Sequence, residues 1–308
     1  LDTGPDEVAL TVTGGVSGAG TLTTNASEVS FGYLIMSGTY NATTHANGTI
    51  LTDRSGPSAQ LLMDAADIVH NNGLFVFKGA SGGSSYCALN GASDATNGLY
   101  NVEIDASSRT VNISTYALTI HNNLTVTAGT FNTSSSDWAL TVGGTTTLAA
   151  TLTLNGSTCS FNSGGTAGGI ILNSGGHVTA DADSTVTIGS IIATTESPVG
   201  ITLSGTNTLN KYYSSGDGYN NRIIHAMDGT VDGATLFTIT TTDANKGIAI
   251  QDPQCSLTFT PASSTSYFLD DSANIAALTI SANATLTTLD GGTSRNLQVA
   301  DVVTIDGI

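Results

Sequence analysis

The stretch "NLTVTAGTFNTSSSDWALTVGG", residues 123–144, decides the fold class of this chain. It holds two copies of Leu-Thr-Val sixteen residues apart, and it contains one acid, no base and one tryptophan. Apolar and hydroxyl side chains alternate in each copy, and this period of two next to Gly, Asn and Ser predicts short β-strands. We expect residues 134–137 to form a turn, and the predicted inward-facing side chains are Leu124, Val126, Phe131, Leu140 and Val142.

The same alternation recurs along the chain, at residues 10–12, 118–120, 124–126, 140–142, 152–154, 186–188 and 278–280. Two longer phrases, "SGTYNAT" at 37–43 and "AGTFNTS" at 128–134, each place an aromatic residue two positions after a glycine. Similar strands recur 22 residues apart from Leu118 to Leu140 and 19 apart from Leu278 to Leu297. Repeats of this length predict a parallel β-helix, or β-solenoid, of about fourteen coils, because each coil buries its inner face only against its neighbours.

Two stretches interrupt the repeat. Residues 57–70 fit either a short amphipathic helix closed by Asn72 and Gly73 or one irregular strand. Residues 210–254 hold turn residues and few repeats, and we expect an irregular excursion or insertion there. The predicted organisation is a solenoid over 1–209, the excursion over 210–254 and a continued solenoid over 255–308, within one elongated domain. One or two β-sandwich domains are the alternative, since short strands with Gly-rich turns suit that class as well.

Four phrases carry a resemblance to a known group of proteins: "HNNGLFVFKG" at 70–79, "GLYNVEID" at 98–105, residues 123–148, and "LTLNGSTCSF" at 152–161. They resemble the Thr/Gly/Asn-rich repeats of large parallel β-helix proteins, which occur in secreted adhesins, in surface layers and sheaths, and in viral tail fibres. The resemblance covers about half the chain and implies a structural or adhesive role. It implies no catalytic residue, because this broad group shares none.

Composition and charge limit the classes of ligand and partner that the chain is expected to bind. The chain has 50 Thr, 33 Ser and 36 Gly but only 10% charged residues, a palette typical of extracellular β proteins. Its formal charge is −17, with three lysines and four arginines scattered through the chain, which disfavours nucleic acid and anionic lipid as ligands. No apolar run is long enough to span a membrane, and no basic-then-apolar leader is present. We therefore expect a processed product or a segment of a longer protein, located outside the cell or on a virion surface.

Carboxylates are the first candidates for chemistry, because polysaccharide-cleaving β-helix enzymes use them in pairs. The spacing of Asp181 and Asp183 would let both side chains leave a strand on one face, whereas the adjacent Asp270 and Asp271 would not share a face. Asp217 lies close to three further polar residues, Asn220, Asn221 and Arg222. We interpret these acids as solvated turn residues and expect no enzyme. They are also candidate ligands for a structural calcium ion, without a motif that assigns one.

Other chemistry-bearing residues favour structural interpretations. The glycines of "TGGVSGAGT" at 13–21 lack the Gly-Lys-Ser/Thr of a phosphate loop and indicate β turns. The five histidines (His45, His70, His121, His177, His225) are far apart in sequence and are expected to face solvent or to be hydrogen-bonded. Cys87, Cys159 and Cys255 fit three buried thiols, one bridge with a free thiol, or an intermolecular bridge. Trp138 and the tyrosines are expected to line or cap the core, with a glycan-binding surface as the alternative.

These observations together predict a mechanical role. We expect an extracellular structural protein that associates with itself, as a building block of a surface filament, sheath, surface layer or virion fibre. A glycan-binding adhesin or receptor-binding fibre is the alternative, with the 210–254 excursion as its binding surface. A polysaccharide hydrolase or lyase is the third. The expected partners are other copies of the chain and surface glycans, with no cofactor.

Overall fold

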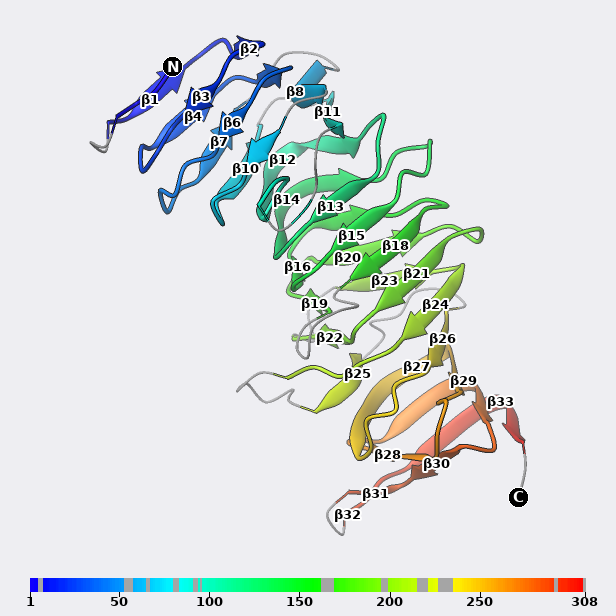
Figure 1. The fold of residues 1–308 in the computed structure, drawn as a ribbon. Helices are drawn as coiled ribbons and strands as arrows, with labels where there is room; N and C mark the ends of the chain where they lie inside the picture. The colour runs from blue at the N-terminus through cyan, green and yellow to red at the C-terminus, as the bar shows by residue number, and fades with distance from the viewer. Residues whose placement is uncertain are drawn as a thin grey trace. The chain divides into compact units, whose positions relative to one another are not determined.

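The computed structural model describes residues 1–4, 8–52, 58–64, 67–79, 83–90, 94, 96–161, 169–194, 199–214, 221–226, 235–290 and 293–306. These residues form strands and turns but no helix, and they build a parallel β-solenoid of about 11 turns. The chain divides into two compact units: unit 1 comprises Leu1–Gly143 with Ala150–Thr153, and unit 2 comprises Gly144–Ala149 with Leu154–Ile308. The predicted solenoid is confirmed, and the sandwich alternative is wrong because the long ladders are parallel (Figure 1).

Unit 1 contains sixteen strands: β1 Leu10–Val12, β2 Val16–Gly18, β3 Leu22–Thr23, β4 Val29–Phe31, β5 Leu34–Met36, β6 Tyr40–Asn41, β7 Thr49–Leu51, β8 Ser58–Asp64, β9 Ile68–Val69, β10 Leu74–Lys78, β11 Gly83–Asn90, β12 Asn101–Ile113, β13 Leu118–Ile120, β14 Leu124–Asn132, β15 Leu140–Val142 and β17 Thr151–Thr153. Each pairs in parallel with a strand of a neighbouring coil, as β1 does with β4 and β4 with β7.

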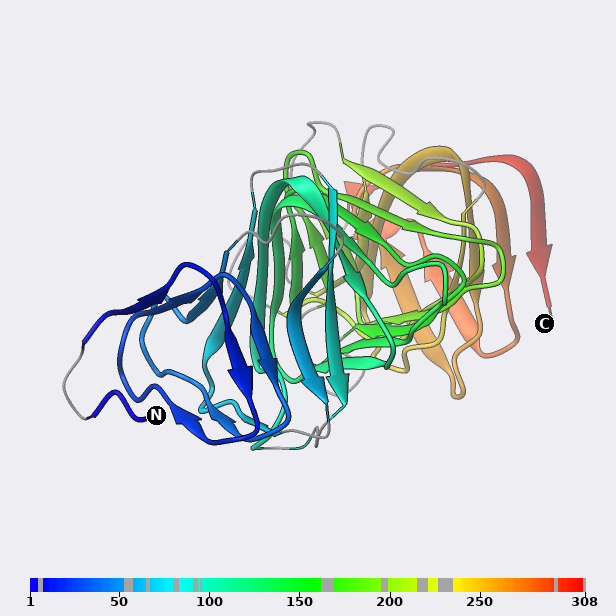
Figure 2. The ribbon, with the colours of Figure 1, turned by 90° about the horizontal axis from the view of Figure 1, so that it is seen from above.

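Unit 2 contains β16 Thr146–Leu148, β18 Thr158–Phe161, β19 Ile170–Leu172, β20 His177–Ala180, β21 Thr185–Ile188, β22 Ile191–Ala193, β23 Gly200–Leu203, β24 Thr206–Leu209, β25 Arg222–Ala226, β26 Leu236–Ile239, β27 Lys246–Phe259, β28 Thr265–Leu269, β29 Ala273–Ile280, β30 Ala284–Thr287, β31 Leu289–Asp290, β32 Thr293–Ser294 and β33 Leu297–Ile305. Figure 2 shows strands of successive coils lying beside one another within this unit. The short β31–β32 hairpin is antiparallel, unlike the ladders.

In each coil the apolar residues of the alternating pattern face the core and the residues between them face outward. All five predicted inward residues of the 123–144 stretch are at most 1% exposed, and residues 134–137 form the predicted turn. Leu118 pairs with Leu140, as the 22-residue spacing predicts. Stacked inward columns of this kind bury an apolar core that no single coil could bury alone.

In both recurrent phrases the glycine stands where there is no room for a side chain. A Cβ at Gly38 would overlap the carbonyl oxygen of Gly20, and a Cβ at Gly129 would overlap that of Ala106. Gly129 also has a φ of 81°, which an L side chain rarely adopts. The aromatic residues that follow, Tyr40 and Phe131, are 0% and 1% exposed. Each phrase therefore marks a place where one coil packs against the backbone of the coil before it.

Three details of the prediction are wrong. Residues 58–64 and 68–69 form strands β8 and β9, so the irregular-strand alternative holds and the helix does not. The solenoid has about 11 turns and not fourteen. Leu278 pairs with Val303, 25 residues later, and not with Leu297, which pairs with Ala273 at the start of β29. Coils lengthened by bulges and loops account for the smaller number of turns.

The stretch 210–254, expected to leave the solenoid, contributes strands to it wherever it is described. Strand β25 pairs with β27, and β26 pairs with β24 and β27, all in parallel. The coil spacing is wide here, since Ile191 pairs with Ile224 across 33 positions. The domain boundaries at 209, 210, 254 and 255 stay predictions.

Candidate functional site

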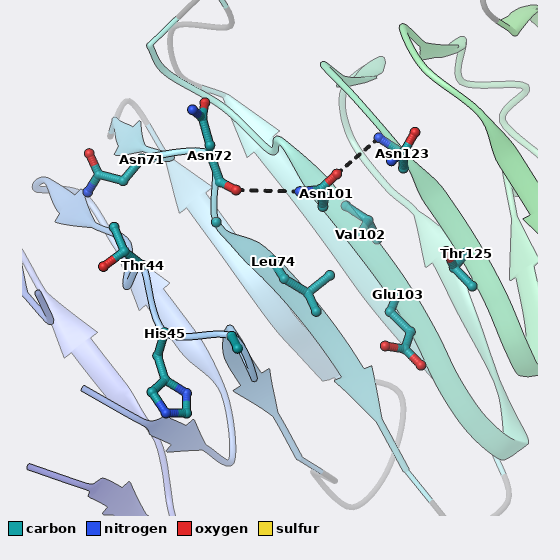
Figure 3. A pocket seen from close by; sticks show the side chains of 12 residues that line it. Thr44, His45, Asn71, Asn72, Leu74, Asn101, Val102, Glu103, Asn123 and Thr125 are labelled. Atoms are coloured by element: carbon teal, nitrogen blue, oxygen red, sulfur yellow. Dashed lines mark hydrogen bonds between the residues drawn. The ribbon is translucent and has the colours of Figure 1, made fainter. Parts of the chain in front are cut away.

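A groove of about 430 Å³ crosses successive coils of unit 1 and is the best-formed hollow among the described residues (Figure 3). Its walls come from the segment after β6, the loop before β10, and the first residues of β12 and β14. Leu74 of β10 lies between His45 and Glu103 in the view of Figure 3. Its lining residues are Thr44, His45, Ala46, Asn71, Asn72, Gly73, Leu74, Asn101, Val102, Glu103, Asn123 and Thr125.

Asparagines form one wall of the groove and are linked from coil to coil. The Asn101 amide donates to the backbone oxygen of Asn72 over 3.4 Å, and its Oδ1 accepts from the Asn122 amide at 2.9 Å and from the Asn123 backbone N–H at 3.3 Å. Asn71 and Asn72 have φ values of 48° and 56°, a conformation that asparagine tolerates better than most residues. The turn chemistry thus places amide groups at equivalent corners of neighbouring coils.

Behind this wall the histidines of the same corners stack. The ring of His70 lies parallel to that of Tyr100 at a centroid distance of 4.9 Å, and 5.7 Å from the ring of His121. His70 is 3% exposed, and its Nδ1 accepts a hydrogen bond from the Asn72 backbone N–H at 2.9 Å. The stack fixes the Asn-Asn turns from inside. The sequence contains a signal for this corner, because "HNN" occurs at 70–72 and again at 121–123. The spacing of the histidines alone does not show that they meet.

A second hollow of about 420 Å³ continues the first, since the two share Ala46, Leu74 and Glu103. Its other lining residues are Glu28, Asn47, Ile50, Val76 and Lys78. The Asn47 amide donates to Glu28 at 3.2 Å, and Lys78 pairs with Asp105 at 3.4 Å. An aliphatic floor edged by amides and two carboxylates suits an uncharged, hydroxyl-rich ligand, because such ligands need both an apolar surface and hydrogen-bond acceptors.

The sequence-predicted carboxylate pair of unit 2 is not on a strand. Strand β20 ends at Ala180, and both Asp181 and Asp183 are exposed in the turn that follows, with Asp183 lying over Gly156. The expected projection from one strand face is therefore wrong, because the backbone turns after Ala180. Asp217 and Asn220 lie outside the described residues.

An ionic cluster in unit 2 instead contains Arg222, Asp270 and Asp271 from among the candidate polar residues. Arg222 forms an ion pair with Asp270, and Arg295 lies 3.9 Å from Asp271. The chain brings these residues together because Arg222 pairs with Gly247, which pairs with Phe268 close to the two aspartates. Lys246 lies nearby, donating to the Asn221 amide oxygen at 3.1 Å and covering the Tyr212 ring at 3.7 Å.

His225 belongs to the same cluster and is held neutral. Burial, helped by the positive charge of Arg222 and opposed by Asp271, lowers the pKa of His225 to about 4. Its Nδ1 lies 2.9 Å from Arg222 Nη1, and because arginine is always a donor, Nδ1 must accept. The cluster is thus internally compensated, which fits a structural brace between coils better than a reaction centre.

The remaining candidates have structural explanations. Cys87, Cys159 and Cys255 are buried free thiols, and burial raises the pKa of Cys87 to about 12, which makes it a poor nucleophile. Gly14 and Gly20 face open space, whereas Gly15 lies against the Tyr33 ring. Trp138 is half-buried beside the 134–137 turn.

Within the described ranges, no three His, Cys, Asp or Glu side chains gather to hold a metal ion. The same part of the chain has no helix with the length and hydropathy needed to cross a membrane. Comparison with known proteins finds no matching family model, no matching curated protein and no matching solved structure.

Proposed function

We propose that this protein is an extracellular structural protein that associates with itself, as a building block of a surface filament, sheath, surface layer or virion fibre. The observation that supports this role is an apolar column on β33 that no other described strand covers. Val303 and Ile305 of β33 are 55% and 63% exposed, whereas their partners on the preceding coils, Leu278 and Phe259 among them, are 2% and 0% exposed.

The first coil has the complementary property. Leu10 and Val12 of β1 are half-buried, while their partners on the second coil, Val29 and Phe31, are 0% exposed. Both edges run in the parallel direction of the ladder, so the last coil of one copy can pair with the first coil of the next. Such a contact joins two different surfaces and repeats without closing, which produces a filament.

The test is the concentration dependence of mass and shape. We expect purified protein to form lengthening polymers in sedimentation velocity and negative-stain microscopy as its concentration rises. The double variant Val303→Asp with Ile305→Asp should remain monomeric, because two carboxylates would be buried in the new interface. Gln298→Asp, on the outer face of the same strand, is the matched control and should polymerise normally. A wild-type protein that stays monomeric at every concentration contradicts the proposal.

A second candidate function, glycan binding, is favoured by the groove of unit 1. Leu74 provides an aliphatic surface, and the Asn101 amide and the Glu103 carboxylate stand beside it as donor and acceptor. Sugars present apolar ring faces and hydroxyl groups together, so this arrangement matches their chemistry. The predicted binding surface at 210–254 is replaced in this proposal by residues 44–125.

Glu103→Gln is expected to weaken glycan binding about tenfold, since it replaces a charged acceptor worth about 1.5–3 kcal/mol with a neutral one. A glycan array followed by titration calorimetry on the best ligand measures the change. Asp137→Asn, an equivalent charge removal at an exposed turn position of the same unit outside both groove linings, is the control and should bind as the wild type does. An array without any ligand, or equal losses in both variants, would exclude the groove as a glycan site.

A further inference from the structure

A ladder of hydroxyl side chains runs along one outer face of unit 2, on seven successive coils. The first five members each stand between two buried residues and so point away from the core, and the last two, Thr279 and Thr304, continue the same column through their register pairs. Direct register pairs join them in the order Ser160, Thr187, Thr208, Thr238, Thr258, Thr279 and Thr304. We name this set the threonine ladder.

The threonine ladder is unusual within this molecule. A column of unit 1, followed through direct register pairs in the same way, mixes hydroxyl, aliphatic and charged residues, from Thr11 through Ser30, Ile50, the buried Val76 and Glu103 to Thr125. A Thr-rich composition alone would produce similar mixtures on both faces. A hydroxyl residue occupies the ladder position on every one of these coils, although the coils differ in length. This regularity indicates that hydroxyl groups are required on this face.

Two further properties describe what the face offers. None of the seven ladder hydroxyls has a hydrogen bond to another side chain or to a carbonyl group in the described part of the chain, whereas Thr24, Thr43 and Thr194 elsewhere do. The second outer position of the same strands holds Thr158, Thr185, Thr206, Leu236, Ser256, Ala277 and Val302. The face thus carries free hydroxyls and methyl groups and no charge, in a chain of net charge −17.

A ligand that uses the whole ladder must repeat at the spacing of the coils, about 4.8 Å. In ice, oxygen atoms about 2.75 Å apart in tetrahedral geometry place second neighbours about 4.5 Å apart. The two repeats diverge by about 0.3 Å per coil, so about three successive coil steps stay within about 1 Å of the ice spacing. Hydroxyl groups can join such a lattice, and methyl groups restrict the orientation of neighbouring water.

The size of the face argues against a second copy of the chain as its occupant. Seven strands at this spacing and three residues of each strand cover roughly 30 by 10 Å, or about 300 Å². Stable protein pairs bury about 800 Å² on each partner, so this face alone is too small for one. An ice surface at its freezing point is in balance with the melt, and a weak local attachment is enough to hinder its growth.

We infer that the threonine ladder is a binding surface for crystalline water, a property independent of the proposed assembly. Purified protein should produce thermal hysteresis in a nanolitre osmometer and should inhibit ice recrystallisation. The double variant Thr208→Lys with Thr258→Lys should lose most of both effects, because two ammonium groups would project from the middle of the face. Thr179→Lys with Thr202→Lys, on paired outer positions of β20 and β23, is the matched control and should keep them.

The expected pattern is activity in the wild type and the control and its loss in the ladder variant, with all three proteins equally folded by thermal melting. If the lysine variant does not fold, Thr238→Val, which removes one hydroxyl and keeps the shape, should still reduce the hysteresis. A folded wild type without effect on ice, or equal losses in ladder and control variants, overturns the inference. So does a ladder variant whose only change is in sedimentation, which would assign the face to another copy of the chain.

Discussion

Replacing Tyr40 with alanine is expected to lower the free energy of unfolding by about 3–5 kcal/mol, the largest effect of any single substitution considered. Tyr40 is 0% exposed and stands edge-on between Phe31 and Phe75, at centroid distances of 6.5 and 5.9 Å. Its hydroxyl lies 2.6 Å from Thr49 Oγ1 and 3.3 Å from Thr24 Oγ1. Alanine would leave a cavity in the core of three coils and two buried hydroxyls without this partner.

The single tryptophan makes the measurement specific, because Trp138 belongs to unit 1, as Tyr40 does. A urea titration followed by Trp138 fluorescence should show the midpoint shift. Tyr40→Phe separates the two contributions and should cost about 1–3 kcal/mol, the penalty for unsatisfied buried hydroxyls. Tyr116→Ala, at a half-buried position of the same unit, is the control. Equal shifts for Tyr40→Ala and Tyr116→Ala would contradict the packing argument.

Gly129→Ala is expected to destabilise the same unit almost as strongly. The φ of 81° at this position costs an L residue about 1–3 kcal/mol, and the new methyl group would also lie 2.6 Å from the carbonyl oxygen of Arg109. The clash is with backbone, so it cannot be relieved by a rotamer change. The same fluorescence titration measures the loss.

Gly14→Ala provides the comparison for this prediction. Nothing lies within 4 Å of a Cβ built at Gly14, so the substitution should leave stability unchanged or raise it slightly by restricting the unfolded chain. If the two alanine variants unfold at the same urea concentration, the close approach of coils at Gly129 is not a determinant of stability.

The sequence predicts this fold well where local pattern and coil spacing agree. All seven alternating Leu-Thr-Val-like runs overlap strands, because a period of two determines which side chains face the core. The failures occur where one coil is longer than its neighbours. Leu297 imitates the pattern of Leu278, yet it pairs with Ala273, and the partner of Leu278 is Val303. The length of a coil depends on contacts between coils and has no local signal.

The groove was harder to foresee than the fold. Its polar wall consists of ordinary turn residues, Asn71, Asn72, Asn101 and Asn123, which are far apart in sequence and meet only after the coils stack. The sequence "HNN" occurs at 70–72 and again at 121–123, which indicates two equivalent corners. The coil between them has Tyr100 and Asn101 at its corner, so the repeat is interrupted. The ionic cluster around Arg222 was invisible for the same reason, since register determines which charges become neighbours.

The wide coil between Ile191 and Ile224 has a consequence for how such a protein can vary. Neighbouring coils in unit 2 need as few as 19 positions, as between Thr265 and Ala284, yet this one uses 33 and the parallel pairing continues across it. Lengthening a surface loop costs little, because closure entropy grows only with the logarithm of its length. The paired strands can therefore keep their register while the loops between them change in length and sequence. A lineage carrying this fold could acquire new surface chemistry by insertion at a corner, with its core residues left untouched.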